Sequence, residues 1–73
     1  MIVSNTKQHR TAANNGKGIS KAWLARKIGA TRSYVVKLEQ GKCQPSAEMM
    51  FRIASYFGKP IESVFQWVEE VKK

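Results

Sequence analysis

The sequence is poor in several features that other classes of protein require. Its 73 residues hold one cysteine, Cys43, and one histidine, His9. A single thiol forms no intrachain disulfide, and one Cys with one His is too few for a tetrahedral metal site. No apolar run approaches the roughly 18 residues of a membrane span, and the first ten residues lack the apolar stretch of a secretory signal. These absences exclude a disulfide scaffold and a zinc finger, and they predict a cytoplasmic protein that contacts no membrane.

Catalytic arrangements are equally scarce. The chain has no Ser-His-Asp or Cys-His constellation, no paired carboxylates and no Gly-rich phosphate loop. A membrane-surface peptide is disfavoured because Gly16, Gly18 and Gly29 interrupt the basic segment, which is therefore not one continuous amphipathic helix. We expect neither an enzyme nor a protein that needs a cofactor or a metal.

Positive charge is the abundant feature, and it is distributed unevenly. Thirteen Lys and Arg against five Asp and Glu give a net charge of +8 and a pI of about 10.1. Residues 1–42 hold nine basic groups and one acid, whereas residues 43–73 hold four of each. A one-sided excess of this kind indicates a polyanionic partner, and nucleic acid is the first candidate.

Helix-start and helix-stop residues predict one small all-α domain over residues 1–73. Three hydroxyl residues stand where N-caps are expected: Ser20, Thr31 and Ser46. A glycine follows each predicted helix: Gly29, Gly41 and Gly58. Between them, apolar residues recur at helical spacing: Leu24, Ala25 and Ile28; Tyr34, Val35 and Leu38; Ala47, Met50, Ile53, Ala54 and Phe57. A polar helix near residues 4–13 and a short one ending near Phe65 complete the predicted bundle of five helices.

The chain ends and one aromatic cluster carry further expectations. Residues 2–3 and 65–68 mix aromatic and β-branched residues, so each end fits an extended strand as well as a helix. Met49, Met50 and Phe51 are predicted to lie in the core. Cys43 is either an inert loop thiol or a sensing one.

The segment from Gly18 to Lys42 combines a helix pair with several short motifs. The two helices meet across a tight turn at Gly29, which is the layout of a helix-turn-helix. The motifs in and just after this segment are Leu24-Ala25, Ile28-Gly29, Leu38-Glu39-Gln40-Gly41-Lys42 and Pro45-Ser46. This combination resembles the Cro/C1-type (XRE) helix-turn-helix family. The resemblance implies a lambda-repressor-like bundle of five short helices, in which some members pair the chain ends as a β-ribbon. It also implies a sequence-specific transcriptional regulator, a repressor, that binds a palindromic double-stranded DNA operator as a homodimer.

The resemblance places the third helix in the major groove. Thr31, Arg32, Ser33 and Lys37 fall on its exposed face, and the last three would meet base edges. Arg and Lys side chains donate to guanine O6 and N7, which agrees with that placement. Tyr34 either donates its hydroxyl to a phosphate or packs behind the helix.

Other residues are assigned by the resemblance to the phosphate backbone. Ser20 and Lys21 match a clamp at the start of the second helix, where backbone N–H groups favour an anion. Gln40, Lys42 and Gln44 match positions along the second backbone. These contacts position the protein and do not specify a sequence.

Departures from the family pattern leave two structural questions open. The family pairs an Arg of the first helix with the Glu of Leu-Glu-x-Gly, which suggests Arg10 with Glu39, but residues 14–17 look inserted and could displace Arg10 in favour of Lys7 or Lys17. Trp23 stands at a position that is usually polar. It either packs as partial core or contacts a partner or the DNA backbone.

Two related functions share the same fold. An antitoxin would use aromatic residues to contact a toxin, and Trp23, Phe65 and Trp67 are the candidates. The controller of a restriction-modification operon would use the same mechanism of DNA binding as the repressor.

Overall fold

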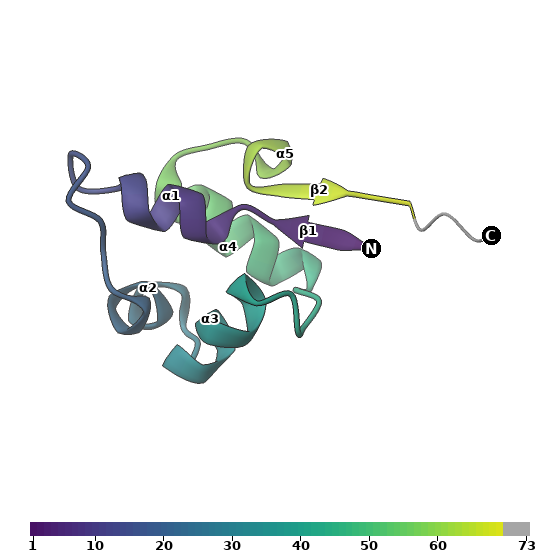
Figure 1. The fold of residues 1–73 in the computed structure, drawn as a ribbon, viewed down its shortest axis with the longest axis horizontal. Coiled ribbons are helices and arrows are strands. Elements are labelled where there is room, and N and C mark those ends of the chain that lie inside the picture. The colour runs from purple at the N-terminus through teal and green to yellow at the C-terminus, as the bar shows by residue number, and fades with distance from the viewer. Residues whose placement is uncertain (70–73) are drawn as a thin grey trace.

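Five helices and two short strands make up the part of the chain that the structure, a computed structural model, describes, residues 1–69. In chain order they are β1 (Ile2–Ser4), α1 (Thr6–Ala12), α2 (Lys21–Ile28), α3 (Arg32–Glu39), α4 (Ala47–Phe57), α5 (Ile61–Val64) and β2 (Phe65–Trp67). The predicted bundle of five helices with paired chain ends is confirmed (Figure 1). Within residues 1–69, none of the helices has the length and apolar character needed to cross a membrane.

Local hydrogen bonds start and stop the helices where the sequence predicts. The hydroxyl oxygens of Ser20, Thr31 and Ser46 each accept a hydrogen bond from the backbone N–H three residues on, at 3.0, 3.1 and 3.1 Å. Gly29 ends α2 in the left-handed conformation, with φ of +73°. A side chain there would be strained, and its Cβ would lie 2.9 Å from Arg52 Nη1, which donates to the carbonyl of Ile28. Only glycine therefore suits the turn between α2 and α3.

One apolar core holds the helices together. Its buried members come from α2, α3, α4, α5 and the start of β2: Leu24, Ala25, Ile28, Val35, Leu38, Ile53, Ala54, Val64 and Phe65. The burial of Phe65, which is 4% exposed, removes it from the residues that could contact a partner. Met49 and Met50 pack at the edge of the core, as predicted.

The prediction for Phe51 is wrong, because this side chain is 64% exposed. Residues advance about 100° around an α-helix, so Phe51 lies more than a quarter turn away from the stripe of Met50, Ile53 and Phe57. Ala47, predicted on the same stripe, is also exposed, in the first turn of α4. Proximity in sequence to Met49 and Met50 therefore did not place Phe51 in the core.

The chain ends form an antiparallel ribbon at one end of the molecule (Figure 1). Its register pairs Ile2 with Trp67, Val3 with Gln66 and Ser4 with Phe65. The Gln44 side chain accepts from the Ile2 N–H at 2.8 Å and donates to the Ile2 carbonyl at 3.1 Å. The amide of Gln44 therefore occupies the outer edge of β1 as a neighbouring strand would.

Arg10 and Glu39 pair in spite of the inserted residues. Arg10 Nε lies 2.7 Å from Glu39 Oε2, and Arg10 Nη2 donates to Oε1 at 3.1 Å. Arg10 Nη1 also donates to the Ile19 carbonyl at 2.8 Å. The loop closes back on α1 because Asn14 and Asn15 adopt positive φ, 55° and 57°, which turns the chain sharply. Neither Lys7 nor Lys17 takes the place of Arg10.

Candidate nucleic-acid interface

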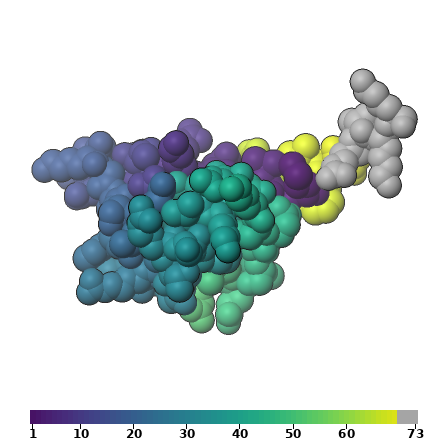
Figure 2. All heavy atoms as spheres, turned by 60° about the horizontal axis from the view of Figure 1, so that its bottom comes forward, coloured from purple at the N-terminus to yellow at the C-terminus, as the bar shows by residue number. Residues whose placement is uncertain are grey.

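The third helix presents a polar face outward because its apolar face is fixed in the core. Val35 is 0% exposed and Leu38 is 1% exposed, whereas Arg32, Ser33 and Lys37 are exposed. Figure 2 looks onto this side of the molecule, where atoms of α3, in teal, lie beside those of α2, in blue. The residues predicted to meet base edges are therefore brought together on one surface.

The cations on this surface are not engaged by the protein itself. Within residues 1–69, Arg32 and Lys37 form no side-chain hydrogen bond and no ion pair. A guanidinium with free donors can bind the O6 and N7 atoms of guanine as a planar, bidentate pair. Thr31 is exposed as well, but its hydroxyl oxygen already accepts from the Tyr34 N–H.

Tyr34 lies between the exposed face and the core. Its side chain is half-buried and packs against the core cluster, as one of its two predicted roles requires. Burial raises the pKa of the Tyr34 hydroxyl above its ordinary value of 10.0, and the nearby Cys43 raises it further. The phenol is therefore protonated at neutral pH and is a hydrogen-bond donor.

The start of α2 has the features of an anion site. Ser20 is exposed, and its hydroxyl oxygen caps the helix by accepting from the Trp23 N–H. No acidic residue lies in the first turn, so no carboxylate neutralises the positive end of the helix dipole. Lys21, the first residue of the helix, is half-buried and adds positive charge.

Three residues at and after the end of α3 are predicted to follow the second phosphate backbone, and the structure gives them different surroundings. Gln40 and Lys42 are exposed there. Gln44 is exposed too, but both ends of its amide bind the main chain of Ile2. Gln44 therefore holds the β-ribbon in place, a role that no local pattern in the sequence indicates, since the two residues lie 42 positions apart.

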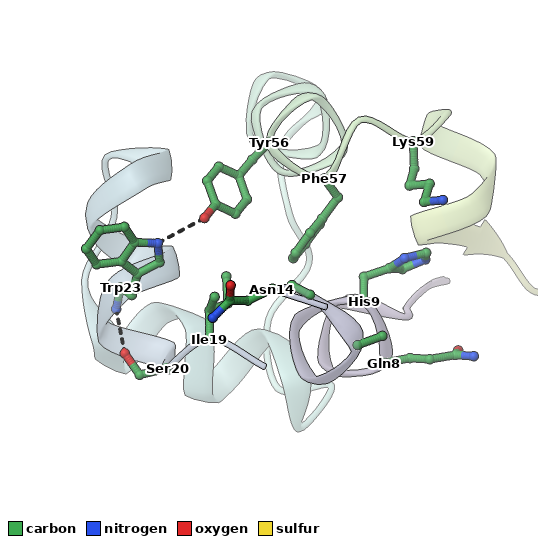
Figure 3. Close-up of a pocket in the computed structure, with 11 residues that line it drawn as sticks. Gln8, His9, Asn14, Ile19, Ser20, Trp23, Tyr56, Phe57 and Lys59 are labelled. Carbon is green, nitrogen blue, oxygen red and sulfur yellow. Dashed lines mark hydrogen bonds between the residues drawn. The ribbon is translucent and has the colours of Figure 1, made fainter. Parts of the chain in front are cut away.

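Sequence reasoning missed Tyr56, which determines the position of Trp23. The indole N–H of Trp23 donates to the Tyr56 hydroxyl at 2.9 Å (Figure 3). Lys27 Nζ lies 4.6 Å from the centre of the Trp23 ring, and Arg26 Cζ lies 6.0 Å from it. Trp23 remains 44% exposed, so it is only partly packed and its ring is flanked by the cations of its own helix. The only sequence signal for Tyr56 is its place beside the apolar stripe of α4.

Comparisons with known proteins agree with this geometry. A sequence model described as helix-turn-helix matches residues 12–64. An uncharacterized HTH-type transcriptional regulator of Methanocaldococcus jannaschii is 38% identical over 47 residues, which cover 64% of this chain and 71% of that protein. One from Archaeoglobus fulgidus is 38% identical over 53 residues, 73% of this chain and 76% of the relative. One from Methanothermobacter thermautotrophicus is 37% identical over 49 residues, 66% of this chain and 71% of the relative.

Proposed function

The chain belongs to the Cro/C1-type helix-turn-helix family of DNA-binding transcriptional regulators, and from this premise we propose that it is a repressor that binds a palindromic operator as a homodimer. The observation that carries the proposal is the outer face of α3, where Arg32 and Lys37 are exposed and unpaired within residues 1–69. Cations held on a rigid helix with free donors suit the major groove, which is wide enough to admit an α-helix.

In this proposal, different residues give sequence preference and affinity. Arg32, Ser33 and Lys37 read base edges, and a good bidentate pair contributes about 1–3 kcal/mol of discrimination. The phosphate contacts come from residues around α3 and at the start of α2: Ser20, Lys21, Thr31, Tyr34, Gln40 and Lys42. These contacts give the salt-dependent part of the affinity and fix the orientation of the protein on the duplex.

The β-ribbon supports the proposed homodimer. Met1 and Val68 exchange backbone hydrogen bonds of 3.0 and 2.8 Å, so the alternation of an antiparallel pair directs the main-chain groups of Trp67 away from β1. Gln44 covers the edge of β1, so among residues 1–69 the edge of β2 is the one left open. Trp67 is 70% exposed and Val68 44% exposed beside this open edge, on opposite faces of the ribbon, so a second copy that pairs there about a two-fold axis can cover part of each.

A salt series tests the DNA-binding part of the proposal. Fluorescence anisotropy would compare a labelled duplex from upstream of the protein's own gene with a scrambled duplex. If the dimer neutralises six or more phosphates, affinity falls by about 10³ or more between 50 and 200 mM salt. We expect the upstream duplex to bind about 10³ more tightly than the scrambled one. A shallow salt slope with equal affinity for both duplexes would overturn the proposal.

The dimer has its own test. Trp67→Pro removes the outward N–H of β2 without removing a bond to β1, and we expect it to shift sedimentation from dimer to monomer. Trp67→Tyr keeps the N–H and is the matched control, which should remain a dimer. A Trp67→Pro protein that sediments like the unsubstituted one would exclude pairing through β2.

A second candidate function is an antitoxin that also represses its own operon. The exposure of Trp23 and Trp67 favours it, because exposed aromatic residues are enriched at protein interfaces. Copurification of a stoichiometric partner encoded beside the gene, lost on Trp23→Ala, would favour it over a stand-alone repressor. A restriction-modification controller would be distinguished only by the genes that its operator precedes.

A further inference from the structure

The large apolar side chains exposed within residues 1–69 gather in two places. One group, Met1, Trp67 and Val68, lies on the β-ribbon that we assign to the dimer. The other group, Trp23, Phe51 and Tyr56, lies on α2 and α4 and has no role in the proposed DNA contacts. We propose that this second group, the aromatic surface, binds an acidic peptide segment of a partner protein that carries apolar anchor residues.

Two adjoining hollows give the aromatic surface its shape. A groove of about 1090 Å³ runs between α1, the start of α2 and the end of α4, with Trp23 and Tyr56 on one side and Ile19 and Phe57 facing into it (Figure 3). A shallower hollow of about 600 Å³ lies on the other side of Tyr56, beside Phe51. A surface that continues from one hollow to the next suits an extended or helical segment better than a small ligand, which requires an enclosed site.

The charge around the aromatic surface selects an acidic partner. Arg26 and Lys27 flank the Trp23 ring, and the hollows include Lys59 and Arg52. The nearby acid that the structure shows, Glu48, lies 3.7 Å from Arg52 and offsets only one of these charges. Cations around an apolar centre steer an anionic segment and discriminate against a cationic one.

The aromatic surface is held in position before anything binds. The Trp23 indole is fixed by its 2.9 Å hydrogen bond to Tyr56, and Lys27 lies over its ring. Trp23 projects from α2 and Tyr56 from α4, and both helices are held in place by the core. Binding therefore loses little side-chain freedom, which is the condition under which exposed aromatic residues contribute most to affinity.

Position and bonding favour a peptide over DNA as the occupant. Trp23 faces α4, not α3, and its indole N–H already donates to Tyr56, so it is not available to a phosphate. One residue that lines the groove, Ser20, is also assigned to a phosphate, but the groove extends from there to the end of α1 and the loop to α2, at the opposite end of the molecule from the β-ribbon (Figure 1). A partner seated there leaves the open edge of β2 clear for a second copy.

The fluorescence of Trp23 provides a direct test. In a Trp67→Phe protein, Trp23 is the remaining tryptophan and reports on the surface. The probe is a synthetic peptide of about 15 residues, four turns of helix, with Leu and Phe on one face and Asp and Glu on the other. Two peptides serve as controls, one with Ser in place of Leu and Phe, and one with Lys in place of the acids. We expect saturable quenching by the probe, with both controls about tenfold weaker or more.

Variants of the surface locate the binding. Phe51→Ser and Lys27→Glu change exposed residues of α4 and α2, and each should weaken the probe about tenfold while leaving affinity for the upstream duplex within about twofold. Ala22→Ser, on the exposed side of α2 away from the surface, is the matched control and should change neither. Circular dichroism confirms that each variant is folded.

Several outcomes would overturn the proposal. No quenching up to about 1 mM peptide, or equal binding of the Ser-substituted peptide, would leave only non-specific attraction. If random duplex DNA quenched Trp23 and Phe51→Ser abolished that quenching, the surface would be assigned to nucleic acid. Sedimentation of Phe51→Ser as a monomer, beside a dimeric parent, would assign it to a second copy of the chain.

Discussion

The two helices of the helix-turn-helix have similar sequences but use their cations differently. Both α2 and α3 have eight residues, begin after a hydroxyl N-cap and carry exposed basic side chains. In α2, Lys27 and Arg26 lie at the ring of Trp23. In α3, Arg32 and Lys37 form no ion pair or side-chain hydrogen bond within residues 1–69. A cation over an aromatic ring stabilises the fold in addition to attracting any anionic partner, whereas a cation without a contact inside the protein acts only on a ligand.

Both helices depend on one part-buried guanidinium, that of Arg10. Arg10 pairs with Glu39 at the end of α3 and donates to Ile19, just before the cap of α2. The Arg10 and Glu39 side chains are 12% and 4% exposed. This link sets how α2 and α3 sit relative to α1, so breaking it should affect both helices at once.

The largest effect is expected for Glu39→Gln, which leaves the part-buried Arg10 charge without its carboxylate. Removing one partner of a fully buried pair costs about 3–5 kcal/mol of stability, and this part-buried pair should approach the lower end of that range, a large share of the total for a small domain. Urea denaturation measures it. The exposed pair of Glu48 and Arg52, at 3.7 Å, provides the control, and Glu48→Gln should cost less than about 1 kcal/mol. Equal losses in the two variants would show that burial does not distinguish the pairs.

The next largest effect is on DNA binding, where a cation of α3 should matter for specificity and a cation of α2 should not. Arg32→Ala should weaken the upstream duplex about 10- to 100-fold and relax specificity at one base pair per half-site, because a bidentate contact is lost. Arg26→Ala, the same type of substitution on α2, should leave the preference for the upstream duplex unchanged. Anisotropy titrations at fixed salt measure both. If Arg26→Ala lost as much specificity as Arg32→Ala, the assignment of α3 to the major groove would be wrong.

A smaller effect concerns stability, to which the cation on α2 should contribute and the cation on α3 should not. Lys27→Ala removes the cation 4.6 Å from the centre of the Trp23 ring and should cost about 0.5–1 kcal/mol of unfolding free energy. Lys37→Ala should leave stability within about 0.5 kcal/mol, as surface substitutions usually do, while it weakens DNA binding. Denaturation and anisotropy on both variants would give this crossed pattern. Parallel losses in both assays would contradict it.

The smallest effect is a pH dependence at Tyr34. Its pKa is raised in the folded state by burial and then by Cys43, so the unfolded phenol, with a pKa of 10.0, ionises first. The favourable contribution is full below about pH 10 and is lost as the pH rises through the folded pKa. Unfolding measurements should therefore show the unsubstituted protein losing stability relative to Tyr34→Phe above about pH 10. A constant difference between the two proteins across that range would show that the shift is absent.

Much of the fold could be predicted from the sequence because its signals act over short distances. A hydroxyl cap bonds three residues ahead, and an apolar stripe repeats within a turn, so Ser20, Thr31 and Ser46 could be recognised locally. The exposed face of α3 could be predicted in the same way, because it is the side of the helix opposite the apolar residues Val35 and Leu38. Phe51 shows the limit of such predictions, because an apolar residue next in sequence to the apolar stripe of a helix need not lie on that stripe.

The residues that the sequence left undecided make contacts across long separations. Trp23 meets Tyr56 33 positions away, and the amide of Gln44 meets Ile2 42 positions away. Whether Arg10 could still reach Glu39 depended on how the loop between α1 and α2 folded, and the backbone of that loop turns back at positive φ at Asn14, Asn15, Gly16 and Gly18.

The sequence by itself determined where helices begin and end, which faces are apolar, and that the excess positive charge lies in residues 1–42. These properties follow from neighbours within a few positions and from composition. The tertiary structure decided which cations are engaged and which are free, which strand edge is open, and which aromatic residues remain exposed. Those properties depend on which distant groups are brought within hydrogen-bonding distance, and only the packing of the helices around a common core fixes that.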